Sequence, residues 1–168
     1  MKTSKQLRKI LLLAALGSTS CLSFAAGTAS ADFQVSATIG DTCTISALPL
    51  DFGQYDQLAT TPKDSTTTIT VKCSKSVPAT IALDNGSSNI TSSRSMRQGS
   101  EELFYALFSD AGHQQNWSTL TGEVVAIIGS GLTPSDQRTL TVYGRIPPGQ
   151  NAVSSGTYRD LITATISY

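Results

Sequence analysis

The chain has 168 residues, with 12 Lys and Arg against 12 Asp and Glu. This length fits one domain at most, and no stretch after residue 31 is apolar for long enough to form a transmembrane helix. A single histidine and three cysteines leave few residues for a zinc site or a catalytic triad.

Residues 1–31 predict a secretory signal peptide. Four basic residues open it, the apolar run 10–16 is too short to span a bilayer, and small residues follow. Cleavage is expected after Ala31, and cleavage after Ala25 fits the same small-x-small pattern. Removing residues 1–31 takes away four basic residues and no acidic ones, which leaves 8 Lys and Arg against 12 Asp and Glu, a net charge of −4. This balance argues against a nucleic-acid partner.

Residues 32–41 contain a strand-like alternation that ends at a Gly-Asp break. Four apolar side chains recur at every second position, which is the period of a β-strand: Phe33, Val35, Ala37 and Ile39. Two interpretations stay open. The segment is either the first strand of its own sheet or a strand that leaves its domain and completes a neighbouring molecule.

The remaining sequence predicts an all-β sandwich. Thr, Ser, Gly, Val and Ile are abundant, no apolar period of 3.6 residues occurs, and short alternating runs are separated by turn residues. We expect 103–108 to be a central strand that is covered on both sides, because it is apolar on both faces. The other strands are expected at 43–47, 67–73, 79–83, 124–128 and 140–143. A polar loop is expected at 56–64, a loop with or without a short strand at 87–101, and a turn at 146–149.

Two cysteines remain after the predicted cleavage, Cys43 and Cys73. Both occupy inward positions of expected strands, and a pair of cysteines in an exported chain is most simply a disulfide. A metal or redox pair would need closer spacing or a nearby histidine. A bridge closing a loop of this size is expected to stabilise the fold by roughly 3–4 kcal/mol.

The sequence predicts no catalytic residue, metal site or cofactor, and therefore no enzyme. His113 lies in a polar stretch and is expected to be an exposed loop residue rather than a general base. Glu101 and Glu102 are neighbours that would point to opposite faces of a strand, so they do not form a cooperating carboxylate pair.

One polar cluster raises the alternative of a carbohydrate-binding surface. Arg94, Arg97 and Trp117 fall in loops by composition and together form a candidate sugar-facing patch. Solvated loop residues are the preferred interpretation of the same side chains.

The last eleven residues, 158–168, predict a strand that runs to the end of the sequence. One face carries Tyr158, Ile162, Ala164, Ile166 and Tyr168, and polar side chains dominate the other. A strand without a cap or polar tail invites a partner strand beside it.

From about Asp32 to Tyr168 the chain resembles the spore coat protein U domain, the subunit fold of archaic chaperone–usher pili. The resemblance rests on the order and spacing of several pieces: Thr42-Cys-Thr-Ile45, Leu50-Asp-Phe-Gly-Gln-Tyr55, Thr70-Val-Lys-Cys73, Leu103-Phe-Tyr-Ala-Leu-Phe-Ser-Asp110, Trp117, Val142-Tyr-Gly-Arg-Ile-Pro-Pro-Gly-Gln150 and Gly156-Thr-Tyr-Arg-Asp-Leu-Ile-Thr-Ala-Thr-Ile-Ser-Tyr168.

The resemblance implies an incomplete immunoglobulin-like sandwich over residues 42–168, completed by a donor strand from another subunit. It implies that 32–41 is the donor segment, with Phe33, Val35, Ala37 and Ile39 as donor residues. The acceptor groove would be bordered by Ile162, Ala164, Ile166 and Tyr168, the Tyr168 carboxylate would anchor basic chaperone residues, and Cys43 and Cys73 would form the family's bridge.

The same resemblance implies a function as a structural subunit of a pilus that supports adhesion and biofilm formation. The partners would be a periplasmic chaperone, an outer-membrane usher and neighbouring pilin subunits, and the location would be the cell surface after export through the periplasm. Two alternatives remain: a tip-located or free carbohydrate-binding module, and a spore or capsule coat protein.

Overall fold

The computed structural model describes residues 26–88 and 93–168; most of the predicted signal peptide, residues 1–25, lies outside them. The described part contains eight strands and one short 3₁₀ turn. These are β1 (Cys43–Ala47), β2 (Lys63–Cys73), β3 (Pro78–Leu83), β4 (Arg94–Gln98), β5 (Glu101–Phe108), β6 (Val125–Ile128), η1 (Pro134–Asp136), β7 (Arg138–Ile146) and β8 (Ala164–Ser167).

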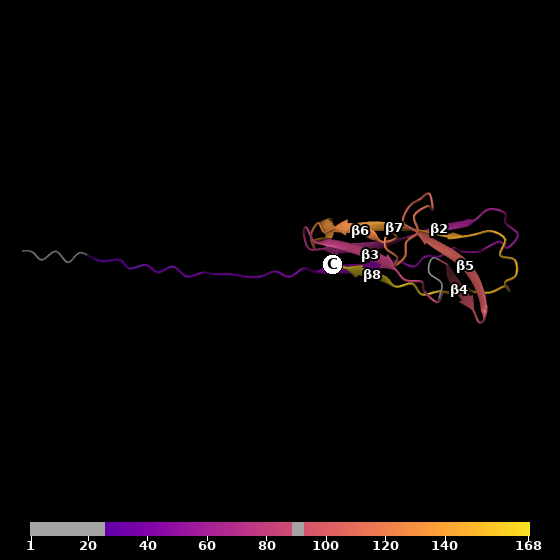
Figure 1. The fold of residues 1–168 in the computed structure, drawn as a ribbon, viewed down its shortest axis with the longest axis horizontal. Coiled ribbons are helices and arrows are strands. Elements are labelled where there is room, and N and C mark those ends of the chain that lie inside the picture. Colours follow the sequence, from indigo (N-terminus) through magenta and orange to yellow (C-terminus); the bar gives the residue numbers. More distant parts are fainter. Residues whose placement is uncertain (1–25, 89–92) are drawn as a thin grey trace, which may run out of the picture. The chain divides into compact units, whose positions relative to one another are not determined.

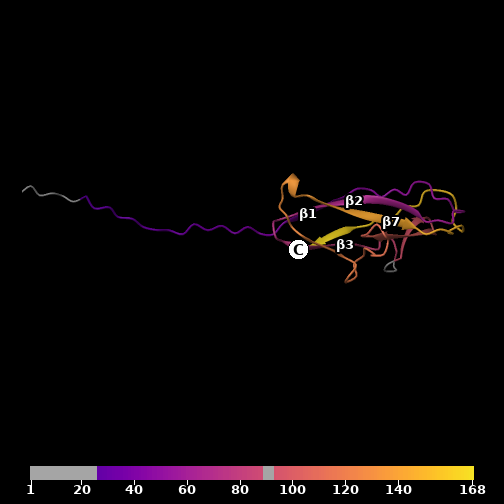
Figure 2. The same ribbon diagram turned by 90° about the horizontal axis from the view of Figure 1, so that it is seen from above.

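The strands form two sheets, so the predicted all-β sandwich is confirmed. The larger sheet has the order β1-β2-β7-β5-β4 and the smaller one the order β6-β3-β8. All neighbouring pairs are antiparallel. Figures 1 and 2 show the sheets as two layers, with β2 and β7 in one and β3 and β8 in the other.

The core lies between these layers and is built from alternate residues of the strands. Trp117 is 1% exposed and its indole Nε1–H donates to the Ile81 carbonyl at 2.9 Å. In β5, Leu103, Tyr105 and Leu107 are buried, whereas Phe104 is 43% exposed. The expectation that 103–108 is covered on both faces was therefore wrong, because the outer face of the larger sheet is open to solvent.

The disulfide between Cys43 and Cys73 is present, as predicted. The two cysteines are directly opposite in the register of β1 and β2, with Cα atoms 4.1 Å apart. The pairing continues one residue outward, since the Ser74 N–H donates to the Thr42 carbonyl at 2.8 Å. The bridge therefore fixes an edge strand to its only strand neighbour in the described chain.

Three side chains are more enclosed than the sequence predicted. Arg94 and Trp117 are each 1% exposed, so the candidate sugar-facing patch and its alternative, solvated loop residues, were both wrong for them. Arg94 opens β4, which lies inside the expected loop 87–101. The His113 side chain is 9% exposed because the rings of Phe108 and Tyr143 cover it edge-on.

Residues 26–42 belong to no helix or strand in the described chain, and the compact body is Thr38–Tyr168. The exposed fractions of Phe33, Val35 and Ile39 are 87%, 82% and 91%. The segment is thus not a first strand of its own sheet. In the described residues, no helix is long and apolar enough to cross a membrane, and no group of three or more His, Cys, Asp or Glu is arranged to hold a metal.

Candidate functional site

The two sheets leave one edge each open on the same side of the body. β1 is the end strand of the larger sheet and β8 the end strand of the smaller one, and the two strands contact each other. Each is hydrogen-bonded to a strand on one side only in the described chain. We call residues 43–58 the N-terminal bank and residues 153–168 the C-terminal bank. The groove is our name for the open side that both banks border, and it is hollowed at 50–58 and 153–158.

The N-terminal bank is held by side chains as well as by its pairing with β2. Beyond β1, the Leu48 N–H donates to the Thr68 carbonyl at 3.0 Å and Thr67 donates back to the Leu48 carbonyl at 2.9 Å. Farther along, the Tyr55 hydroxyl donates to the Pro147 carbonyl at 2.9 Å. The core-facing apolar side chains of this bank are Cys43, Ile45, Leu50, Phe52 and Tyr55.

The C-terminal bank begins beside one sheet and ends in the other. Arg159 exchanges two main-chain hydrogen bonds with Arg97 of β4, at 2.8 and 3.1 Å, and Ala164–Ser167 then pairs with β3. The expected strand 158–168 was therefore too long, because the chain crosses between sheets before β8 begins.

The predicted alternation in this bank is nonetheless present. Ile162, Ala164 and Ile166 are half-buried against the core, while Leu161 is 82% exposed on the other face. Tyr168, predicted to share their face, is 59% exposed. Half-buried apolar side chains on an open edge are what an additional strand would cover.

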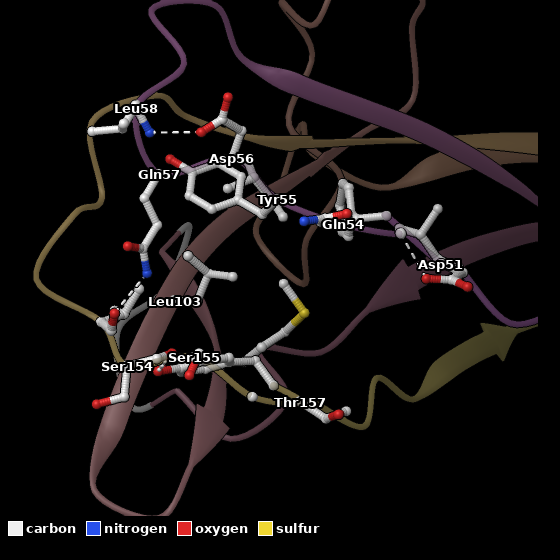
Figure 3. A pocket seen from close by; sticks show the side chains of 18 residues that line it. Asp51, Gln54, Tyr55, Asp56, Gln57, Leu58, Leu103, Ser154, Ser155 and Thr157 are labelled. Atoms are coloured by element: carbon white, nitrogen blue, oxygen red, sulfur yellow. Dashed lines mark hydrogen bonds between the residues drawn. The ribbon is translucent and has the colours of Figure 1, made fainter.

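A cavity of about 1020 Å³ lies between the two banks, at the end of the groove away from Tyr168 (Figure 3). Its apolar floor contains Met96, Leu103 and Ile146. Figure 3 shows Tyr55, Asp56 and Gln57 along one side and Ser154, Ser155 and Thr157 along the other. The Gln57 side chain crosses the gap and donates to the Val153 carbonyl at 2.6 Å, which ties the two banks together.

Glu101 fixes the wall of this cavity. Its carboxylate accepts hydrogen bonds from the Tyr158 hydroxyl at 2.5 Å and from the Ser154 hydroxyl and N–H at 2.7 and 2.8 Å. The Tyr158 bond, followed by those from Ser154, lowers the pKa of Glu101 from its usual range. These bonds tie the segment 154–158 to the start of β5.

A second carboxylate, Asp160, lies in the apolar stripe of the C-terminal bank. It accepts from the buried Tyr105 hydroxyl at 2.6 Å and from the Ser87 N–H and hydroxyl, each at 2.7 Å. Burial, followed by the hydrogen bond to Asp160, raises the pKa of Tyr105. The sequence interpretation overlooked this residue, although a charged side chain among inward-facing apolar ones was a visible signal.

The buried guanidinium of Arg94 completes this polar cluster. It donates to the carbonyls of Leu83, Asp84 and Trp117 at 3.1, 2.8 and 2.8 Å. Burial lowers the pKa of Arg94, and the surrounding acidic groups oppose that shift. Its bonds fix the end of β3, beside which the C-terminal bank crosses between sheets.

The open edges and the cavity together offer main-chain hydrogen-bonding groups and half-buried apolar side chains to an extended chain. An added strand would form main-chain hydrogen bonds with an open edge and place alternate side chains over the half-buried residues of both banks. The half-buried apolar side chains that alternate along both banks favour apolar side chains at every second position of such a strand. The exposed stripe Phe33, Val35, Ala37 and Ile39 has this spacing.

Comparison with known proteins identifies relatives of this chain. The sequence model of the Spore Coat Protein U domain matches residues 29–165. "Protein U" of Myxococcus xanthus is 31% identical over 160 residues, covering 85% of this chain and 87% of that protein.

A solved structure has a similar fold. It is a chain from the crystal structure of the CsuC–CsuE chaperone–tip adhesion subunit pre-assembly complex from archaic chaperone–usher Csu pili of Acinetobacter baumannii, with a TM-score of 0.57 and 23% identity. The match covers 78% of this chain but only 40% of the solved one.

Proposed function

Because the chain belongs to the Spore Coat Protein U domain family, we propose that it is a non-enzymatic structural subunit of a surface pilus assembled by donor-strand exchange. The observation that carries the proposal is the pair of open sheet edges at β1 and β8, with half-buried apolar side chains on both banks and a cavity at one end. In this proposal residues 1–31 are the signal peptide, 32–41 the donor segment and 42–168 the pilin domain.

The donor in this proposal is the segment 33–39 of another copy. Its apolar side chains are almost fully exposed, and burying Phe, Val or Ile contributes roughly 1.5–3 kcal/mol each. Ile162, Ala164, Ile166 and Tyr168 border the groove that receives it. Main-chain hydrogen bonds between the donor and the groove then supply affinity. The alternating apolar side chains, each in its own pocket, fix the register of the donor.

The polarity of the donor follows from where the chain enters and leaves the body. The body begins at Cys43, which pairs with Cys73 at the end of β2. A short connection leads from Cys73 to β3, and Ser167 of β8 pairs with Thr80 near the start of β3. The first and last strands therefore meet at one end of the body. A donor parallel to β8 would bring its own body to this end as well, which favours a closed pair. An antiparallel donor leaves the groove at the cavity end and permits an open head-to-tail fibre. Ile39 then lies toward the cavity.

Before assembly, a periplasmic chaperone strand would occupy the same groove, and an outer-membrane usher would exchange it for the donor of the next subunit. The Tyr168 carboxylate, at the exposed end of the C-terminal bank, is proposed to anchor basic chaperone residues. The proposal places the subunit on the cell surface, where the fibre supports adhesion and biofilm formation. The solved chain of similar fold comes from a chaperone–subunit complex of a pilus, which supports this assignment.

The test is deletion of residues 32–39 from the exported chain. The shortened chain should still form a complex with the chaperone but should yield no fibres by electron microscopy. A matched control replaces 32–39 with a segment of the same length in which Phe33, Val35, Ala37 and Ile39 are kept and the polar residues are changed, and it should assemble. Fibres from the deleted chain would refute the donor assignment.

A second candidate is a spore or capsule coat protein that assembles through the same groove. The name of the matched family favours it. Electron microscopy of the exported chain separates the two: the pilus proposal requires thin extended fibres, whereas a coat protein forms a layer. The alternative of a carbohydrate-binding module loses support, because Trp117 and Arg94 are both buried.

A further inference from the structure

We propose that Asp160 is a positioning residue that holds the middle of the C-terminal bank in place while the groove is empty. The inference rests on the function proposed above, since it concerns how the groove is kept ready for a strand. It assigns a role to a side chain that faces the core among apolar neighbours and is neither a donor nor a groove-lining apolar residue.

The bank has a gap in its main-chain pairing where it crosses between the sheets. Arg159 is bonded to Arg97, and the next pairing on this side is that of Thr163, whose carbonyl accepts from the Asp84 N–H at 3.0 Å. Residues 160–162 have no main-chain to main-chain hydrogen bond in the described structure. Local disordering of such an unpaired stretch at an edge costs little free energy, because few hydrogen bonds are broken.

Asp160 replaces the missing pairing with side-chain bonds. One carboxylate oxygen accepts from the Tyr105 hydroxyl, and the other from Ser87 and from the Leu161 N–H at 2.9 Å. Asp84 adds a bond to the Thr163 N–H at 2.9 Å. At Gly86, with φ +58°, a Cβ atom would collide with the Asp160 carboxylate, so the turn after β3 approaches the bank closely.

All of these contacts come from the side of the bank that faces the turn after β3 and strand β5. None comes from the N-terminal bank, residues 43–58. The contacts therefore order residues 160–163 without occupying the space where a strand would bind. An edge that is already ordered spares the incoming strand the entropy cost of ordering it.

The experiment measures binding of a fluorescent peptide of residues 31–41 to the full chain carrying Val35→Asp and Ile39→Asp, which cannot donate its own segment. Asp160→Ala should raise the Kd about tenfold, because the peptide must then order the bank. Tyr105→Phe, which removes one donor, should have a smaller effect. Asp136→Ala is the control, because its carboxylate bonds Thr133 at η1, outside both banks, and should leave the Kd unchanged.

Hydrogen exchange separates positioning from general support. In Asp160→Ala, the Leu161 and Thr163 amides should exchange faster than in the parent when the groove is empty, and at the parent rate when the peptide is bound. The inference would be overturned if Asp160→Ala bound the peptide as tightly as the parent. It would also be overturned if the amides of the variant exchanged faster by the same factor with and without the peptide. If Asp160→Ala does not fold, the peptide Kd and the amide exchange are measured on Asp160→Asn and Tyr105→Phe instead. A parent that binds no peptide would instead overturn the proposed function, and this inference with it.

Discussion

Removing the disulfide should destabilise the body and loosen one bank of the groove. The bridge closes a loop with a sequence separation of 30 residues. In the chain-entropy description, a loop of this length stabilises the folded state by about 3.6 kcal/mol. The lost stability should affect β1 most, because β2 is its only strand partner in the described body. The hydrogen bond between Ser74 and Thr42, just outside the bridge, should weaken with it.

The assay is urea unfolding of the chain with both Cys43→Ala and Cys73→Ala, followed by the fluorescence of Trp117, the single tryptophan. Its indole is buried, so its emission reports on the core. With a slope of about 2 kcal/mol/M, the midpoint should fall by roughly 2 M. A reductant should shift the parent toward the double variant and leave the double variant unchanged. A loss below about 1 kcal/mol would refute the reasoning, since loop closure alone predicts three times that.

Three further changes test the polar contacts behind the groove. Arg94→Ala should cost about 3–5 kcal/mol in urea unfolding, because three main-chain carbonyls, two of them in buried hydrogen bonds, lose the guanidinium that donates to them; a cost near zero would contradict the described bonding. Gly86→Ala should cost about 1–2 kcal/mol, because the residue has φ +58° and its Cβ would meet Asp160, and Gly99→Ala, at φ +61° with open space around it, should cost less. The pKa of Glu101 is lowered by its bonds to Tyr158 and Ser154, so its stabilising contribution is present above pH 4.5, its usual pKa, and is lost as pH falls through the lower folded value. Glu101→Gln should flatten that acid limb in thermal unfolding measured against pH, and an unchanged limb would show that the carboxylate is not held as described.

Much of the fold could be predicted from the sequence, because buried and exposed side chains alternate along a strand. The alternation in β1, β3 and the C-terminal bank placed Ile45, Ile81 and Ile166 toward the core. The same periodicity put Cys43 and Cys73 on inward faces, and an exported pair of cysteines left few alternatives to a bridge. Strand lengths were less well predicted, because Pro and Gly mark turns more clearly than polar residues mark strand ends.

Alternation alone failed where polar side chains enter the core. Arg94 looked like a loop residue, yet it is buried because three main-chain carbonyls surround its guanidinium. His113 is covered by the ring of Phe108, which is near in sequence, and by that of Tyr143, which is distant and is brought beside it only by the pairing of β5 with β7. The cavity was equally hidden, since its walls at 50–58 and 153–158 are mostly irregular segments tied by Gln57 and Glu101.

The central claim is that residues 33–39 of one molecule lie in the groove of another, and a photochemical cross-link tests it most directly. Phe33 is replaced by benzoylphenylalanine in an isotope-labelled chain, which is assembled with unlabelled chains and irradiated, and the cross-linked peptides are identified by mass spectrometry. The account predicts cross-links between labelled and unlabelled chains, with the partner residues in 43–58 or 153–168. Cross-links confined to single molecules, or to residues outside both banks, would contradict it.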